Sequence, residues 1–150
     1  MIKALNPKAH SLSPTTKNIV FNSICLLCLF LFAYTGFDKI ITHETFEKSL
    51  MRIPVIGPYA SFISWAVPLT ELGVAVLLIL PPTQKIGLYL FSSMMIAFTI
   101  YIGSMLMWVE KLPCNCGGVI SKLSWTQHLW FNLAFITLAA IALWLKRNNH

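Results

Sequence analysis

Charged side chains are the scarcest class in this sequence. Only 11% of its residues are charged, whereas 57% are hydrophobic, and a soluble domain carries about 25% charged residues. That shortage excludes an ordinary water-soluble fold, because 150 residues form no interior large enough to hide so much apolar surface. Lipid is therefore the expected solvent for most of the chain.

The sequence also lacks the patterns of several other protein classes. Basic residues outnumber acidic ones by 11 to 5. No Lys/Arg run is dense enough to bind nucleic acid, so the excess indicates membrane topology and contact with membrane lipids. Four cysteines are too few for a disulfide framework, and they have no zinc-finger spacing. Without internal repeats or low-complexity tracts, the chain is expected to form one bundle and no separate soluble domain.

Four long apolar runs account for most of the sequence. They cover about residues 19–37, 59–80, 86–109 and 125–145, and each has the roughly 20 residues that a helix needs to cross about 30 Å of hydrocarbon. Helices satisfy their own backbone hydrogen bonds, which lipid cannot do for them. The predicted fold class is all-α: a polytopic membrane protein with a four-transmembrane-helix bundle over residues 19–147, preceded by a polar arm at 1–18.

The connections between these runs differ in length. Residues 81–85 leave room only for a tight turn, whereas residues 38–58 are long enough for a short helix. The apolar residues of that second segment recur at loosely helical spacing, so we expect it to lie on the membrane surface. The third connection, at 110–124, contains two cysteines.

Four spans would place both ends of the chain on one side of the membrane. That side carries six Lys and Arg residues and the other side five, so the positive-inside rule favours cytoplasmic termini in a bacterial inner membrane. We expect the first run to be a retained helix, because it is too long for a signal peptide and no clear cleavage site follows it. The two longer connections would then face the oxidising periplasm.

The third connection carries the most distinctive motif, Cys114-Asn-Cys116 followed by Gly117 and Gly118. A disulfide within Cys-x-Cys closes a small, strained ring, and strained, exposed disulfides are the labile ones. Pro113 ahead of the pair and the glycines behind it would allow a tight bend that leaves the sulfurs open to a partner. The pattern favours thiol–disulfide exchange.

Ser124 is the expected N-cap of the last helix, which puts His128 in its first turn. A histidine at a helix N-terminus tends to stay neutral and could accept a thiol proton, and thiolate attack drives disulfide exchange. Two other interpretations stay open. The cysteine pair could be structural or have no role, or Cys114, Cys116 and His128 could form a transient copper or zinc site with His43.

Glu71 is an ionisable residue inside the second span, where such a group is costly and faces the bundle interior or water. Asp38 and Lys39 end the first span near the same side, so we expect them within reach of Glu71. Two roles stay open: hydrogen bonding between helices, and a proton or quinone site at which Pro68 would kink the helix and free a carbonyl.

Cys25 and Cys28 lie three residues apart on one face of the first span. Such a pair could relay electrons toward a quinone. Buried cysteine is more often a small apolar residue, and that is the role we expect.

Several segments together resemble the DoxX/MauE-like family of four-helix membrane proteins. They are Tyr-Thr-Gly-Phe-Asp-Lys at 34–39, Phe-Glu-Lys-Ser-Leu at 46–50 with Ile-Pro at 53–54, and Trp-Ala-Val-Pro-Leu-Thr-Glu-Leu at 65–72. The cysteine segment at 112–120 and the Leu-Ser-Trp-Thr-Gln-His segment at 123–128 are similar to the redox-associated MauE-like branch. The resemblance covers about residues 18–146.

The resemblance implies a periplasm-facing thiol pair that works with a thioredoxin-like partner. In the methylamine-utilisation case such a protein assists maturation of a disulfide-rich enzyme subunit, and other relatives accompany quinone-linked oxidoreductases. We therefore predict a redox accessory protein in which Cys114 and Cys116 exchange electrons with a thioredoxin-like or disulfide-rich protein, with His128 as a base. Whether the chain is itself a thiol-disulfide oxidoreductase, and whether it uses a quinone, stays open. The alternatives are a non-catalytic subunit of a larger membrane complex and a quinone- or proton-linked subunit centred on Glu71.

Overall fold

The computed structural model describes residues 13–108 and 124–147, which are almost entirely helical and contain no strand. In chain order the elements are α1 (Pro14–Ile41), α2 (His43–Met51), the 3-10 turn η1 (Gly57–Tyr59), α3 (Ala60–Ile79), α4 (Gln84–Trp108) and α5 (Trp125–Arg147). The predicted all-α class is confirmed. The short helix α2 occupies the connection for which the sequence predicted one.

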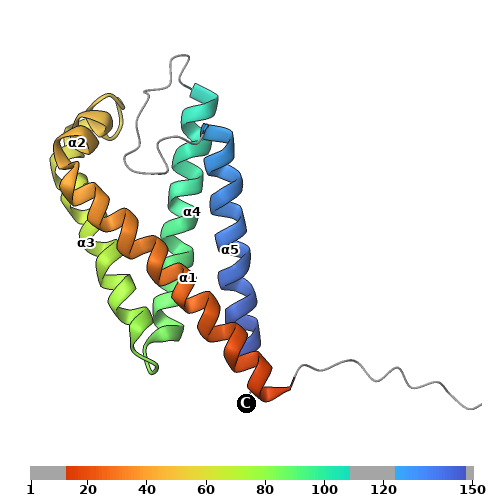
Figure 1. Cartoon of the computed structure of the whole chain (residues 1–150). Helices are drawn as coiled ribbons and strands as arrows, with labels where there is room; N and C mark the ends of the chain where they lie inside the picture. Colours follow the sequence, from red (N-terminus) through yellow and green to blue (C-terminus); the bar gives the residue numbers. More distant parts are fainter. Residues whose placement is uncertain (1–12, 109–123, 148–150) are drawn as a thin grey trace, which may run out of the picture.

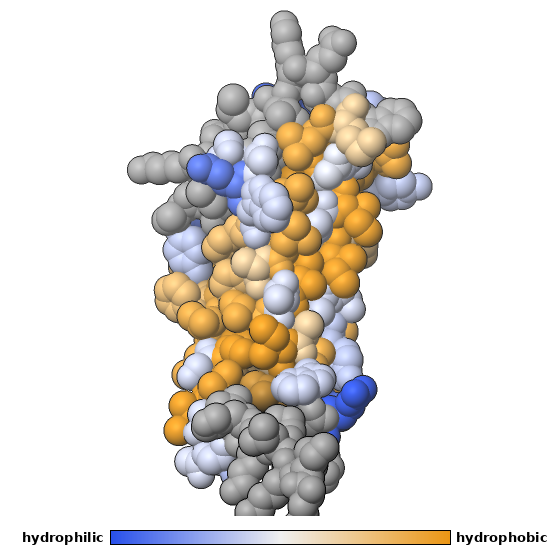
Figure 2. Space-filling model, turned by 90° about the vertical axis from the view of Figure 1, so that its right-hand side faces the viewer, coloured by the Kyte–Doolittle hydropathy of each residue, from blue (hydrophilic) through white to orange (hydrophobic). Residues whose placement is uncertain are grey.

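Four of these helices are long and apolar enough to cross a membrane: Pro14–Ile41, Gly57–Ile79, Gln84–Ser104 and Thr126–Arg147. Their outer faces carry large apolar side chains, such as Phe30, Phe62, Ile100 and Trp130. Figure 2 shows hydrophobic residues across the middle of the visible face, with strongly hydrophilic ones only toward its two ends. The chain is therefore a multi-pass membrane protein.

Helix α1 is longer than the apolar run that predicts it. It includes the last five residues of the expected polar arm, and the Ser13 hydroxyl caps it by accepting a hydrogen bond from the Thr16 amide at 3.2 Å. It also continues past Phe37, where the first span was expected to stop, through Asp38 and Lys39 to Ile41. Charges ended the predicted span, whereas the helix continues because the structure supplies a partner for Lys39.

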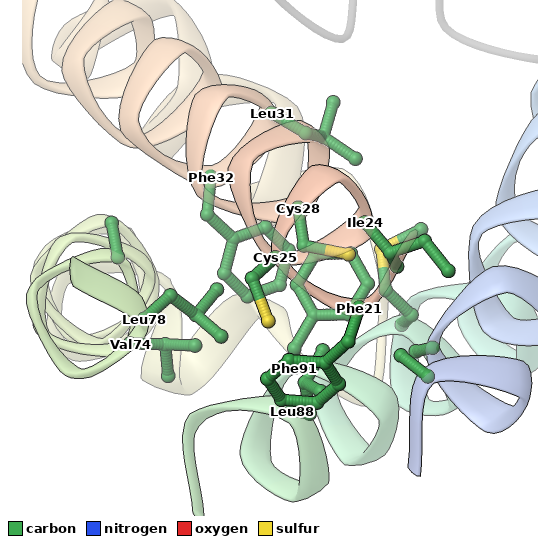
Figure 3. Packing of buried hydrophobic residues seen from close by; sticks show 14 residues of the cluster. Phe21, Ile24, Cys25, Cys28, Leu31, Phe32, Val74, Leu78, Leu88 and Phe91 are labelled. Carbon is green, nitrogen blue, oxygen red and sulfur yellow. The ribbon is translucent and has the colours of Figure 1, made fainter. Parts of the chain in front are cut away.

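Helix α1 runs obliquely across the bundle, packing mainly on α3 and also on α5, while α4 packs on α5 and α3 (Figure 1). The core lies between these four helices. The rings of Phe32 in α1 and Phe91 in α4 are 4.4 Å apart between centroids, and Leu78 and Leu88 lie beside them (Figure 3). In lipid such close packing, and not the removal of apolar surface from water, holds helices together.

The turn between α3 and α4 is tight, as the sequence predicts. The Thr83 hydroxyl donates to the carbonyls of Leu77 at 2.7 Å and Leu80 at 3.1 Å, which satisfies backbone groups at the end of α3. A Cβ on Gly87 would lie 2.9 Å from Leu78 Cδ2. Any larger residue at this position would have to displace the Leu78 side chain, so glycine favours the close start of α4 against α3.

The bundle has two distinct ends (Figure 1). The terminal end comprises the start of α1, the turn between α3 and α4, and the end of α5. The loop end comprises the end of α1, helix α2, the start of α3, the end of α4 and the start of α5. These two names are used below.

Candidate functional site

A buried ion pair joins α1 to α3 toward the loop end. The Lys39 ammonium lies 2.8 Å from Oε1 and 3.0 Å from Oε2 of Glu71, so it donates to both carboxylate oxygens. The Glu71 side chain is only 1% exposed and that of Lys39 20% exposed. The structure thus brings together two of the three charged residues that the sequence analysis placed within reach of each other.

Gly36, one turn before Lys39, explains how the pair can form. A Cβ at Gly36 would lie 3.2 Å from the Pro68 carbonyl oxygen and 3.3 Å from Glu71 Cβ. The missing side chain lets α1 approach the backbone of α3 at this level. Pro68 has no amide hydrogen, so the usual hydrogen bond to the Ser64 carbonyl is absent in this part of α3.

Lys39 contacts more than its carboxylate partner. Its ammonium also donates to the Thr35 carbonyl at 3.4 Å. It lies 6.0 Å from the Phe46 ring centroid in α2 and 5.7 Å from that of Phe98 in α4, within the range of cation–π attraction. The ammonium therefore contacts groups in α2, α3 and α4 as well as in its own helix α1. Its charge is balanced mainly by Glu71.

His128 faces the interior from the first turn of α5. Ser124 caps this helix as predicted: its hydroxyl accepts from the Gln127 amide at 3.3 Å, and the Gln127 side chain accepts from the Ser124 amide at 2.9 Å. Within the described part of the chain, both ring nitrogens of His128 are buried without a hydrogen-bond partner. His128 therefore keeps its full hydrogen-bonding capacity at the loop end, the end toward which the ion pair also lies.

Asp38 does not reach Glu71 and is not part of the ion pair. Its side chain is half-buried, and its Oδ2 atom has no hydrogen-bond partner in residues 13–108 or 124–147. Its backbone carbonyl accepts from the amide and hydroxyl of Thr42, which ends α1. Asp38 Oδ2 is thus a second buried polar atom at the loop end without a partner among the described residues.

The sequence analysis considered His43 only as a metal ligand, whereas in the structure it fastens α2 to α3. The buried Ser64 hydroxyl donates to the Ser61 carbonyl at 2.8 Å, so its oxygen accepts from His43 Nε2 at 3.0 Å. The His43 ring also packs on Trp65, with 4.3 Å between centroids. The available signal in the sequence was a histidine shortly after the first span, together with a serine and a tryptophan early in the second span.

Cys114, Cys116, Gly117 and Gly118 lie outside the described residues. The helices that flank them, α4 and α5, end and begin at the loop end. In the described part of the chain, no three side chains of the His, Cys, Asp and Glu types gather to hold a metal ion. The loop end therefore combines the ion pair, His128 and the attachment points of the cysteine connection.

Cys25 and Cys28 lie away from this cluster, in the apolar core. They are 2% and 0% exposed and unpaired, and Figure 3 shows their side chains among Ile24, Phe32 and Phe91. Their surroundings fit the role of small apolar residues.

Comparison with known protein families gives a match over most of the chain. The sequence model of the family described as Methylamine utilisation protein MauE matches residues 17–145, which covers the four long helices except for the first three residues of α1 and the last two of α5. The chain belongs to the MauE family. A comparison with curated proteins gives no match, and neither does a comparison with solved structures. As a MauE family member, the chain is a multi-pass membrane protein whose family is described by its involvement in methylamine utilisation.

Proposed function

We propose that this MauE family protein is a redox accessory protein that exchanges thiol and disulfide with a partner outside the membrane. The residues proposed for the reaction are Cys114 and Cys116, and the partner class is a thioredoxin-like or disulfide-rich protein. The observation that carries the proposal is the state of His128. Its buried ring nitrogens have no partner among the described residues, in the first turn of the helix that follows the cysteine connection.

The chemistry needs no group beyond the two proteins. A thiolate of the Cys114 and Cys116 pair attacks a sulfur of the partner's disulfide, forming a mixed disulfide and releasing one partner thiolate. The second cysteine then attacks the mixed disulfide, so the pair becomes a disulfide and the partner a dithiol. The reverse sequence oxidises the partner. An unpaired imidazole nitrogen of His128 would accept the thiol proton and return it to the leaving thiolate.

The proposal places the loop end in the periplasm and both termini in the cytoplasm of a bacterial inner membrane. Four described cations lie at the terminal end, namely Lys17, Lys85, Lys146 and Arg147. Of the described residues, the loop end has three cations, Lys39, Lys48 and Arg52, of which the first two are paired with Glu71 and Glu44. The positive-inside rule supports this orientation.

A second candidate function centres on Glu71. A fully buried carboxylate paired with Lys39, toward the same end of the bundle as an imidazole with free hydrogen-bonding capacity, is an arrangement that can bind the polar head of a quinone or transfer protons. Under this alternative, Glu71→Gln abolishes activity and the double serine variant of Cys114 and Cys116 has no effect. Under thiol exchange, the double serine variant is inactive.

The deciding experiment combines thiol labelling with mixed-disulfide trapping in cells. A membrane-impermeant maleimide should label Cys114 and Cys116 only after reduction, and Cys116→Ser should trap a covalent partner that the double variant Cys114→Ser/Cys116→Ser does not. The matched control is Cys25→Ala/Cys28→Ala, which should trap normally. Normal partner maturation in the double serine variant, or labelling only after the membrane is permeabilised, would refute the proposal.

A further inference from the structure

Among the residues that the structure describes, one end of this molecule has no acidic side chain. The sequence has five: Asp38, Glu44, Glu47, Glu71 and Glu110. The first four lie in α1, α2 and α3 toward the loop end, and Glu110 comes two residues after the end of α4, which is also at that end. The terminal end instead carries Lys17, Lys85, Lys146 and Arg147.

Two of these cations face the same seam between α1 and α5. The Lys146 ammonium lies 4.9 Å from the centroid of the buried Phe21 ring in α1. Lys17 precedes Phe21 by one helical turn, so it lies on the same face of α1. Both lysine side chains are half-buried. Lys146 of α5 therefore lies over Phe21, and Lys17 lies one helical turn before Phe21 on the face of α1 that meets α5.

The protein supplies no acidic side chain to balance these charges. Of the described residues, none forms an ion pair with any of the four cations. The segments attached to this end, residues 1–12 and 148–150, contain no Asp or Glu. The described residues, together with the side chains of those two segments, therefore offer these cations no carboxylate.

Helix dipoles explain only part of this distribution. Lys146 and Arg147 occupy the last turn of α5, where cations are favourable. Lys17 and Lys85 lie near the starts of α1 and α4, where a cation opposes the dipole, and neither helix has an acidic residue in its first turn. Two positive helix ends thus add to the cationic field and make this end attractive to an anion.

We propose that the terminal end binds the phosphate of an anionic phospholipid in the seam between α1 and α5, with Lys17 and Lys146 as its ligands. Arg147 and Lys85 contribute long-range attraction. The source is a lipid because these residues lie near the ends of membrane-crossing helices, at the depth where headgroup phosphates lie. This site is independent of the proposed thiol chemistry at the loop end.

The test measures lipid binding to the purified full-length protein by native mass spectrometry after mixing with phosphatidylglycerol or phosphatidylcholine. The wild type should retain phosphatidylglycerol preferentially, and Lys17→Gln/Lys146→Gln should weaken that retention about thirty-fold, because a basic residue at an acidic membrane surface contributes about 1 kcal/mol and 1.4 kcal/mol is tenfold. The matched control, Lys48→Gln/Arg52→Gln at the loop end, should retain it normally. Circular dichroism confirms that each variant is folded.

Three outcomes would overturn the proposal. They are equal retention of the two lipids by the wild type, undiminished retention by the double glutamine variant, and equal loss in the loop-end control. Displacement of phosphatidylglycerol by millimolar inorganic phosphate would assign the site to free phosphate and not to lipid. If the glutamine variant does not fold, the wild type's preference and its decrease with rising salt still decide the question.

Discussion

Lys39 and Glu71, 32 residues apart in the sequence, form a two-pronged ion pair inside the bundle, with both carboxylate oxygens within 3.0 Å of the ammonium. A single charge in this position would be expensive, because lipid and protein interior solvate ions poorly. The pair therefore fixes the register of α1 against α3 as well as neutralising both groups. It is the structural centre of the loop end.

Removing one partner of this pair should destabilise the protein more than removing both. Glu71→Leu or Lys39→Met alone leaves a buried charge and should cost about 3–5 kcal/mol, while the double variant should recover most of that loss. Unfolding of the detergent-solubilised protein by a denaturant measures both quantities. The exposed pair of Lys48 and Glu44, 3.6 Å apart, is the matched control, and its removal should change stability by at most about 1 kcal/mol. Additive single effects would contradict a coupled pair.

Gly36→Leu should separate α1 from α3. The new side chain would collide with the Pro68 carbonyl and Leu72, both 3.2 Å from the position of a Cβ, and overpacking of this kind costs about 1–3 kcal/mol. Gly73→Leu in α3 is the control, because nothing lies within 4 Å of its Cβ position, and its stability should change by no more than about 0.5 kcal/mol. Equal melting temperatures for the two variants would show that the close approach does not matter.

His128→Phe should slow thiol exchange without unfolding the protein. The ring makes no hydrogen bond to the described residues, so little stability depends on its nitrogens, whereas loss of a general base typically costs about 100-fold or more in rate. Stopped-flow reaction with a small aromatic disulfide gives the rate. The wild-type rate should fall at acid pH because a protonated His128 cannot act as a base, and the variant should lack this fall. A rate within twofold of wild type over the whole pH range would remove His128 from the reaction.

His43→Ala should loosen α2 from the bundle. It removes the hydrogen bond to Ser64 and the ring contact with Trp65, so the amide hydrogens of α2 should exchange about tenfold faster, as expected for the loss of about 1.4 kcal/mol. Hydrogen-exchange mass spectrometry of the segment 43–51 measures this. Lys48→Ala on the exposed side of α2 is the control and should exchange at the wild-type rate.

Cys25 and Cys28 should not react with thiol reagents in the folded protein. Both are almost completely buried in the apolar core, so reagents reach them only after unfolding. Quantitative labelling before and after denaturation, in a Cys114→Ser/Cys116→Ser background, isolates the two thiols. Rapid labelling of either residue in the folded state would contradict the packing between α1 and α4.

Much of the fold follows from the sequence because hydrophobic length alone specifies membrane helices. The boundaries of α1 could not be predicted from the sequence. A lysine such as Lys39 is typical of the end of a span, and the sequence does not show that Glu71 neutralises it. The proximity of those two residues was predicted from their depth, whereas the role of Gly36 depends on which face of α1 meets α3. Because α1 has apolar residues on every side, its sequence does not show which face meets α3.

The candidate site was only partly predictable for a similar reason. Ser124 as a helix cap and His128 in the first turn are local features, so spacing along the chain specifies them. The contact between His43 and Ser64 depends on how the connection folds back over α3. Likewise, whether a buried histidine finds a hydrogen-bond partner depends on five packed helices and not on neighbouring residues.

The order of synthesis gives the pair of Lys39 and Glu71 a role in assembly. The ribosome produces Lys39 first, and until α3 emerges its ammonium has no carboxylate to meet within the bilayer. The last turn of α1 is therefore expected to stay at the aqueous boundary during translocation and to enter the hydrocarbon only when α3 docks. Correct insertion of the first helix thus depends on the arrival of the second membrane-crossing helix.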